Sequence, residues 1–324
     1  MGSSCPTSNY QFLIPPDQEQ MFYVLETFLF ICNIIAVVHL HRSQKNSELR
    51  IRTTFMLTCS VLCDFTIGVL VNPILFFPIP GGFATGFFTY FLNIKTSHQI
   101  VISYTVVTTM ILSMLILSEY KHYILLPFFS PIKLETKWRV VLFSMQLPYL
   151  YSAAPLIVYL LSCDQNSLKT EILRRMSCIP PEFNNNAHFF VIGHMNITFY
   201  LYLVWLLTMS SQIILHILHA FYIVARNKTK IISRVTLQMH RRALYSLAFQ
   251  VSIPCVICLF PCFYLLYSIM FTYYNQTLND IAMKSVSLHG TVTIITTLIL
   301  ETSKTRKNSI KVKPHQQAVY SSRY

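Results

Sequence analysis

Long apolar stretches alternate with basic loops along this chain, and this alternation limits what the chain can fold into. About seven stretches approach the roughly 20 apolar residues that a helix needs to cross a hydrocarbon core about 30 Å thick. Twenty of the 25 Lys and Arg residues lie in every second gap between these stretches or in the C-terminal segment. Because short loops rich in Lys and Arg stay in the cytoplasm, the pattern predicts a polytopic helical membrane protein with its N-terminus outside and its C-terminus inside.

The composition supports the same class of protein. The 324 residues are 53% hydrophobic and only 11% charged, whereas a soluble domain carries about 25% charged residues. A net charge of +13 would suggest nucleic acid as the partner of a soluble protein. Here the basic residues lie in short loops and a tail, where insertion orientation and anionic lipids explain them. We therefore expect membrane lipids, and no nucleic acid, as the partner of these loops.

The predicted fold class is all-α, a bundle of seven transmembrane helices. An even number of spans would put one basic group on the wrong side of the membrane, whereas seven spans keep the alternation. The predicted regions are an extracellular N-terminus at 1–20, a seven-transmembrane domain at 21–302 and a basic cytoplasmic tail at 303–324. Within the domain, the spans lie at about 21–41, 53–77, 97–117, 138–161, 196–224, 243–270 and 281–300.

Five prolines lie inside the predicted spans. In a membrane bundle, neighbouring helices and polar side chains can satisfy the carbonyl group that a proline frees. We therefore expect these prolines to bend their helices rather than end them. They are Pro73, Pro148, Pro155, Pro254 and Pro261.

One carboxylate, Asp64, lies near the middle of the second span. A carboxylate at that depth costs about 2.5–3.5 kcal/mol on insertion scales, which makes Asp64 a candidate for an intramembrane polar switch, an ion site or a partner of a polar helix. The alternative is a hydrogen-bonded group that joins two helices, and the sequence leaves both open. Glu26 lies near the outer end of the first span, where we expect it to reach water.

Other residues with reactive side chains do not form a catalytic or metal-binding pattern. His216 and His219 share a face of the fifth span, but zinc needs three or four converging ligands, so we expect these histidines to make polar contacts. No catalytic cluster can be assembled from the sequence. We therefore predict a protein without a metal or other cofactor and without enzymatic activity.

The predicted external segments contain candidates for covalent modification. Cys163 and Cys178 lie in the external loop at about 162–195, and Cys5 is external too. Disulfides persist in that compartment, so Cys163–Cys178 and Cys5–Cys178 bridges are alternatives that the sequence leaves open. Asn196 and Asn275 match the glycosylation sequon, but they lie so close to the membrane that they are weak candidates.

Several segments resemble one receptor family. Seven spans in this orientation resemble a G-protein-coupled receptor, although the chain has no Asp-Arg-Tyr after span three and no Asn-Pro-x-x-Tyr in span seven. The segments 63–78, 178–183 and 250–254 resemble the nematode serpentine chemoreceptors of class H, in the Str superfamily. Asn275-Gln-Thr-Leu-Asn279, leading to Ser287-Leu-His289-Gly290, is similar to that family's seventh-span signature.

The resemblance implies a chemosensory receptor in the plasma membrane, with the sensory cilium as one candidate location. A small-molecule ligand would bind among the outer halves of the helices, and a heterotrimeric G protein would dock on the inner ends of spans three, five and six. The candidates for that inner surface are Glu119, Tyr120, Lys121, Arg241 and Arg242. The chain departs from the family where it reads Glu119-Tyr120-Lys121 in place of a Glu-Asn-Arg-like triplet.

A multi-pass transporter or channel for a small solute is the alternative function. Many transporters consist of repeated halves with broken helices near the middle of the membrane. An odd number of spans, few buried charges and only seven glycines argue against this class.

Overall fold

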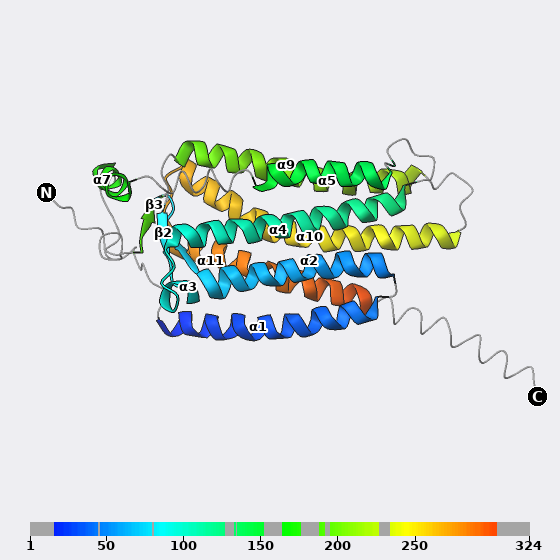
Figure 1. Cartoon of the computed structure of the whole chain (residues 1–324), viewed down its shortest axis with the longest axis horizontal. Helices are drawn as coiled ribbons and strands as arrows, with labels where there is room; N and C mark the ends of the chain where they lie inside the picture. The colour runs from blue at the N-terminus through cyan, green and yellow to red at the C-terminus, as the bar shows by residue number, and fades with distance from the viewer. Residues whose placement is uncertain are drawn as a thin grey trace, which may run out of the picture.

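The computed structural model describes residues 16–44, 46–79, 81–126, 133, 135–151, 164–175, 188–191, 195–226 and 234–302. Within them, long helices run side by side along one axis and form an elongated bundle (Figure 1). Each of the seven predicted spans contains a described helix, so the predicted all-α bundle is confirmed. The helices are α1 (Pro16–Ser43), α2 (Ser47–Phe65), α4 (Thr96–Leu125), α5 (Thr136–Tyr151), α9 (Met195–Arg226), α10 (Arg234–Met270), and α11 (Gln276–Ser287) with a second helix, His289–Thr302.

The lengths and compositions of these helices suit a membrane. Gln20–Ser43, Ser47–Val71 and Thr96–Ile124 are each long and apolar enough to cross a bilayer, and the bent pair Gln276–Ser287 with His289–Thr302 passes the same test as one span. Shorter apolar stretches lie inside α9 and α10. The outward face of α1 is apolar, because Val24, Phe28, Ile31 and Ile35 recur at helical spacing and are each more than half exposed.

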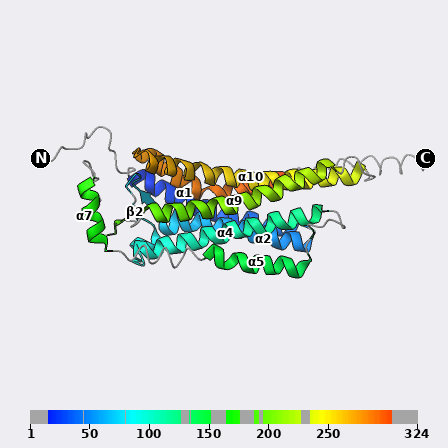
Figure 2. The same ribbon diagram turned by 90° about the horizontal axis from the view of Figure 1, so that it is seen from above.

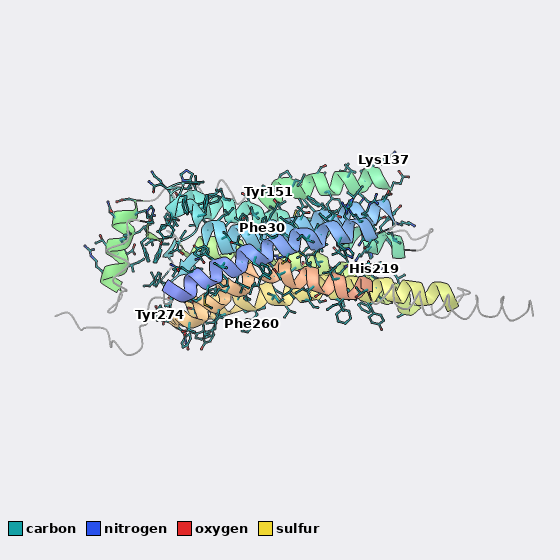
Figure 3. The ribbon with its side chains drawn as sticks, turned by 90° about the horizontal axis from the view of Figure 1, so that it is seen from below. Phe30, Lys137, Tyr151, His219, Phe260 and Tyr274 are labelled. Carbon is teal, nitrogen blue, oxygen red and sulfur yellow. The ribbon has the colours of Figure 1, made fainter. Side chains whose placement is uncertain are left out.

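The largest apolar core lies between α1, α2, α4 and the last helix. Its fully buried members include Met56, Leu57, Leu115, Leu117 and Ile294. α5 lies on the outside of the bundle beside α4 (Figure 2). The described helix ends that flank the basic segments lie at one end of the bundle, which we call the basic end (Figure 1). In Figure 3, Lys137 and His219 lie towards this end, and Tyr274 lies at the other.

A small antiparallel sheet covers the opposite end of the bundle, which we call the sheet end. Its strands are β1 (Pro73–Leu75), β2 (Gly81–Ala84) and β3 (Phe190–Val191), in the order β1-β2-β3. Ile74 pairs with Phe83, and Gly82 pairs with Phe190. The short helices α3 (Phe87–Tyr90) and α7 (Gln165–Arg175) lie at this end too, and α7 runs across the bundle axis (Figure 2).

The sheet has its own apolar core. Phe76, Ile79, Phe83, Phe189 and Val191 are buried together, and Leu168 and Ile172 of α7 pack on them. A Cβ atom on Gly82 would lie 2.1 Å from the carbonyl oxygen of Ile74, so only glycine allows the β1–β2 approach. The external loop predicted at 162–195 contains the helix α7 and the strand β3. Neither was predicted from the sequence, because both elements are short.

Three predicted features of the spans need correction. The second span does not continue through Pro73, because α2 passes into a π-helical turn, η1 (Thr66–Val71), and Asn72 then takes a left-handed conformation with φ of 40°. Pro73 begins β1 and so does not bend a helix; the residue before a proline is pushed out of the α region. The third span does not end at 117, since α4 continues to Leu125.

The other described prolines do not end their helices; whether they bend them stays a prediction. Pro148 lies inside α5, and Pro254 and Pro261 lie inside α10. Pro155 falls outside the described residues.

Candidate functional site at the helix break and the basic end

The seventh span is broken at Leu288, where α11 and the helix His289–Thr302 meet at an angle of 46°. The first turn of the second helix is capped by a residue from another helix. Asp64 of α2 accepts hydrogen bonds from the backbone N–H groups of Gly290 (2.9 Å) and Thr291 (2.8 Å). The first N–H groups of a helix lack intrahelical partners, and a carboxylate is favourable there. Asp64 therefore does for this helix what an N-cap side chain does within one chain segment.

The imidazole of His289 completes the cap. Its Nδ1 lies 2.8 Å from Oδ1 of Asp64 and 2.8 Å from the carbonyl oxygen of Val286. Both neighbours are acceptors, so Nδ1 carries the proton. The ring is fully buried, and Nε2 has no hydrogen-bond partner within the described part of the chain. On the other side, Asn33 of α1 donates to Oγ1 of Thr291 at 2.8 Å. Three spans therefore meet at one polar cluster.

Gly290 permits the close approach of α2 to the broken span. A Cβ atom at this position would lie 2.6 Å from the carbonyl oxygen of Ser60 and 2.7 Å from Oδ2 of Asp64. Small residues let helix backbones approach closely in membranes. The glycine and the carboxylate therefore belong to the same contact between helices.

A second carboxylate, Glu26, holds the end of α11. Glu26 is only 2% exposed, and its Oε1 accepts a hydrogen bond of 2.9 Å from the hydroxyl of Ser287. Its side chain lies over Gly68 in η1, where a Cβ atom would be 3.0 Å from Cδ of Glu26. The expectation that Glu26 reaches water is wrong, because this face of α1 points into the bundle. The signal was present: Glu26 and the buried Asn33 are seven residues apart and share a helix face.

The N-terminal end of α11 is joined to β1 and to the turn that follows it. At the sheet end, Gln276 donates to the carbonyl oxygen of Leu75 and Asn279 donates to that of Phe77, each at 3.1 Å. The side chain of Asn275 caps α11 by accepting from the backbone N–H of Leu278 at 3.1 Å. The structure thus brings together the segments 63–78 and 275–290, which carry the resemblance described above.

At the basic end, Glu119 is engaged in an ion pair. Arg139 of α5 donates from Nε and Nη2 to the two carboxylate oxygens of Glu119, both at 2.6 Å. The two side chains are only 11% and 17% exposed. The guanidinium group of Arg139 also lies 4.0 Å from the ring centre of Tyr123. A bidentate pair of this kind is a strong, directional contact, and it ties α4 to α5.

The neighbouring candidates Tyr120 and Lys121 also make contacts within the bundle. Tyr120 is buried, and the guanidinium group of Arg52 lies 4.3 Å from its ring centre. The ammonium group of Lys121 donates to Oε1 of Gln250 in α10. Gln250 in turn donates to Oγ1 of Thr297 in the last helix at 3.4 Å. A polar chain therefore joins spans three, six and seven.

Histidines link α4 to α9 near the same end. Nε2 of His122 lies 2.7 Å from Nδ1 of His219, and the rings of His122 and His216 are stacked with 5.3 Å between their centres. The predicted polar contact is thus present for His219, whereas His216 stacks on His122 and its Nδ1 has no hydrogen-bond partner among the described residues. Their partner His122 was missed, because the third span was predicted to end five residues earlier. Among the described residues, no group of three or more His, Cys, Asp or Glu side chains is arranged to hold a metal ion.

The remaining candidates cannot be placed as side chains. Arg241 and Arg242 belong to α10 and Asn196 belongs to α9, but their side chains are outside the description. Cys5, Cys163 and Cys178 lie outside the described residues, so the disulfide alternatives stay predictions.

Comparison with models of protein families gives a match over most of the chain. Residues 21–304 match the model of a family described as "Serpentine type 7TM GPCR chemoreceptor Srh". The matched region includes the helix break, both carboxylates and the contacts at the basic end. A search of curated proteins found no match.

Proposed function

The chain belongs to the Srh family of serpentine seven-transmembrane chemoreceptors, and from this premise we propose that it binds a small molecule towards the sheet end and signals to a heterotrimeric G protein at the basic end. The family establishes a multi-pass membrane protein of the chemosensory receptor class, as the alternation of apolar and basic segments predicts. The ligand, the G protein and the plasma-membrane location are the finer parts of the proposal.

The observation that best supports signalling is the set of contacts along the last helix. Asp64 holds its first turn against α2, and Thr297 contacts the chain Gln250–Lys121 nearer the basic end. α11, on the other side of the break, is attached to the sheet through Gln276 and Asn279. A displacement at the sheet end therefore has a continuous route of contacts to spans three and six.

The break in span seven is a suitable two-state element. Two rigid helices meet at one residue, and polar contacts rather than a continuous backbone ladder fix the angle between them. A ligand can shift such an equilibrium only by binding one packing better than the other. We propose that a ligand changes the angle at Leu288, and that the last helix then alters the contact between Gln250 and Lys121.

The basic end offers a surface for the G protein. α10 projects beyond the neighbouring helices at this end (Figure 1). Glu119 and Tyr120 are largely buried in contacts with Arg139 and Arg52, which makes them supports of the surface rather than contacts with a partner. Arg241 and Arg242, on α10, are the proposed contacts.

Nucleotide exchange tests this function. Membranes containing the full chain are supplied with purified heterotrimers and a panel of small volatile and water-soluble compounds. We expect at least one combination to raise guanine-nucleotide exchange severalfold. Changing Arg241 and Arg242 together to Ala should abolish this response with surface expression intact. The same change at Arg174-Arg175, an equal loss of charge on the sheet-end side, should preserve it. Intact exchange in the first variant, or loss of its surface expression, would count against the proposed surface.

The broken helix is the feature that would favour the alternative function, a transporter, because transporters use half-helix N-termini to hold substrates. In this chain, however, the N-terminus at the break is already occupied by the carboxylate of Asp64. Compound-dependent solute flux in proteoliposomes, without nucleotide exchange, would reverse this preference.

A further inference from the structure

A cavity of about 510 Å³ lies between α4, α5 and α9 near the basic end. Its size is within the range of about 300–1,000 Å³ that small-molecule sites occupy. It is separate from the helix break and from the sheet end, where the proposed chemosensory ligand would bind. The walls combine apolar side chains with a small number of converging polar groups, which is the usual make-up of a ligand site.

Three imidazoles lie in the polar wall beside two pairs of side chains that bond to each other. Glu119 and Arg139 neutralise each other in their bidentate pair. Nε2 of Gln146 donates to Oε1 of Gln212 at 3.1 Å, and Oε1 of Gln146 has no partner among the described residues. Three histidines remain: His122 and His219 share one hydrogen bond, and Nδ1 of His216 is buried with no partner in the described residues.

The charges around the cavity favour an acidic guest. Glu119 is the one carboxylate among the wall residues, and it is bound by Arg139. Lys133 adds a second cation, 4.9 Å from the ring centre of Tyr123, which is itself part of the wall. A neutral imidazole donates one hydrogen bond from its N–H group, and a carboxylate or phosphate oxygen can accept it. Hydrogen bonds in which the acceptor is ionised are stronger than neutral ones. A cationic guest would find no free acid here.

The rim of the cavity reaches the lipid-facing surface. Leu215 belongs to the wall and is 62% exposed. Met145 of α5 is 68% exposed, and Leu218 of α9 is 59% exposed. In a bilayer such surfaces face acyl chains. A guest with a polar head among the histidines can therefore extend an apolar tail past Leu215 into the leaflet.

We propose that this cavity binds a long-chain acid from the leaflet at the basic end. The acid head lies among His122, His216 and His219, and the alkyl tail passes Leu215. A free fatty acid and lysophosphatidic acid share this chemistry, an anionic head on one alkyl chain. Because the walls come from spans three, four and five, the bound acid would hold these spans together whether or not a G protein is present.

Photolabelling tests this site directly. The full chain is purified in phosphatidylcholine nanodiscs and exposed to palmitic acid that carries a diazirine group, and the adducts are mapped by mass spectrometry. We expect labelling of α5 and α9 near the basic end. Palmitate or lysophosphatidic acid should compete at least tenfold better than hexadecanol, which has the same chain and no acid group. The stronger of the two acids identifies the source. Equal competition by hexadecanol, or adducts confined to other helices, would overturn the proposal.

Two variants and one matched control locate the head group. His216→Phe keeps an aromatic ring against His122 but removes both nitrogens, and it should weaken labelling about tenfold, the loss expected for a hydrogen bond to a charged group. Phe143→Trp places a larger ring in the wall and should reduce labelling. The matched control is His98→Phe, the same substitution at an exposed position near the sheet end of α4. It should leave labelling unchanged. Labelling of the first two variants at the wild-type level would refute the site. If His216→Phe does not fold, Phe143→Trp and the hexadecanol comparison decide the question.

Discussion

Replacing Asp64 by Asn should destabilise the bundle, because the side chain of Asn cannot accept all the bonds that the carboxylate accepts. Asp64 receives hydrogen bonds from the backbone N–H groups of Gly290 and Thr291 and lies within 2.8 Å of Nδ1 of His289. An Asn side chain has one oxygen and one NH₂ group. If its oxygen faces Thr291, its NH₂ group faces Gly290 and His289, which are both donors.

The expected loss follows from the number of donors left without an acceptor. A buried donor without a partner costs about 1–3 kcal/mol. At least one backbone N–H group loses its acceptor, while the imidazole N–H group of His289 keeps the carbonyl oxygen of Val286, so we expect the free energy of unfolding to fall by about 1–3 kcal/mol. The lower end of this range equals the loss of about 1 kcal/mol that is typical of an ordinary helix N-cap.

The assay is reversible unfolding of the purified chain in mixed micelles by sodium dodecyl sulfate, followed by tryptophan fluorescence. Trp205 is only 4% exposed and should report the loss of packing. Asp280→Asn is the matched control, because Asp280 lies in the same span but accepts from the side chain of Gln276. A fall no larger for Asp64→Asn than for this control would refute the claim that the carboxylate holds the break.

Three further predictions concern other contacts of the bundle. Gly290→Ala should lower the free energy of unfolding by about 1–3 kcal/mol, because the added methyl group overpacks against α2. Alanine in a helix is otherwise favoured over glycine by about 1 kcal/mol. A variant that is more stable in the same assay would contradict the close contact. Glu119→Gln should cost about 1–3 kcal/mol, whereas Glu135→Gln, in an exposed pair of 3.8 Å, should cost less than about 1 kcal/mol; equal losses would mean that burial does not strengthen the first pair. Lys121→Met removes a bond between spans three and six, and it should raise ligand-independent nucleotide exchange severalfold; unchanged exchange at equal surface expression would show that this bond does not restrain the bundle.

Hydropathy and the positions of basic residues were enough to predict the bundle, because both follow from the thickness and charge asymmetry of a membrane. The helix break was not predictable in the same way. The run at 281–300 is apolar enough to resemble one continuous span, and Gly290 alone does not indicate a break. The break depends on Asp64, which lies more than 200 residues earlier in the chain, and no local pattern contains that contact.

The candidate site shows the same division between local and long-range information. The sequence left Asp64 open between a functional group and a group that joins helices, and its bonds to His289, Gly290 and Thr291 establish the joining role. The switching role stays a proposal. The burial of Glu26 was missed because its exposure was judged from its distance to the membrane centre. The face of α1 on which it lies was not considered. The triplet at 119–121 was predicted to face a partner, but α4 continues through it and turns Glu119 and Tyr120 towards other helices.

Membrane topology is the measurement on which the receptor proposal depends first. Epitope tags are placed at both ends of the full chain and detected on intact and then on permeabilised cells. The proposal predicts an N-terminal tag that is detected on intact cells and a C-terminal tag that is detected only after permeabilisation. This result would place the basic end, with Arg241 and Arg242, in the cytosol. Both tags on one side would mean an even number of spans and would contradict the proposed receptor.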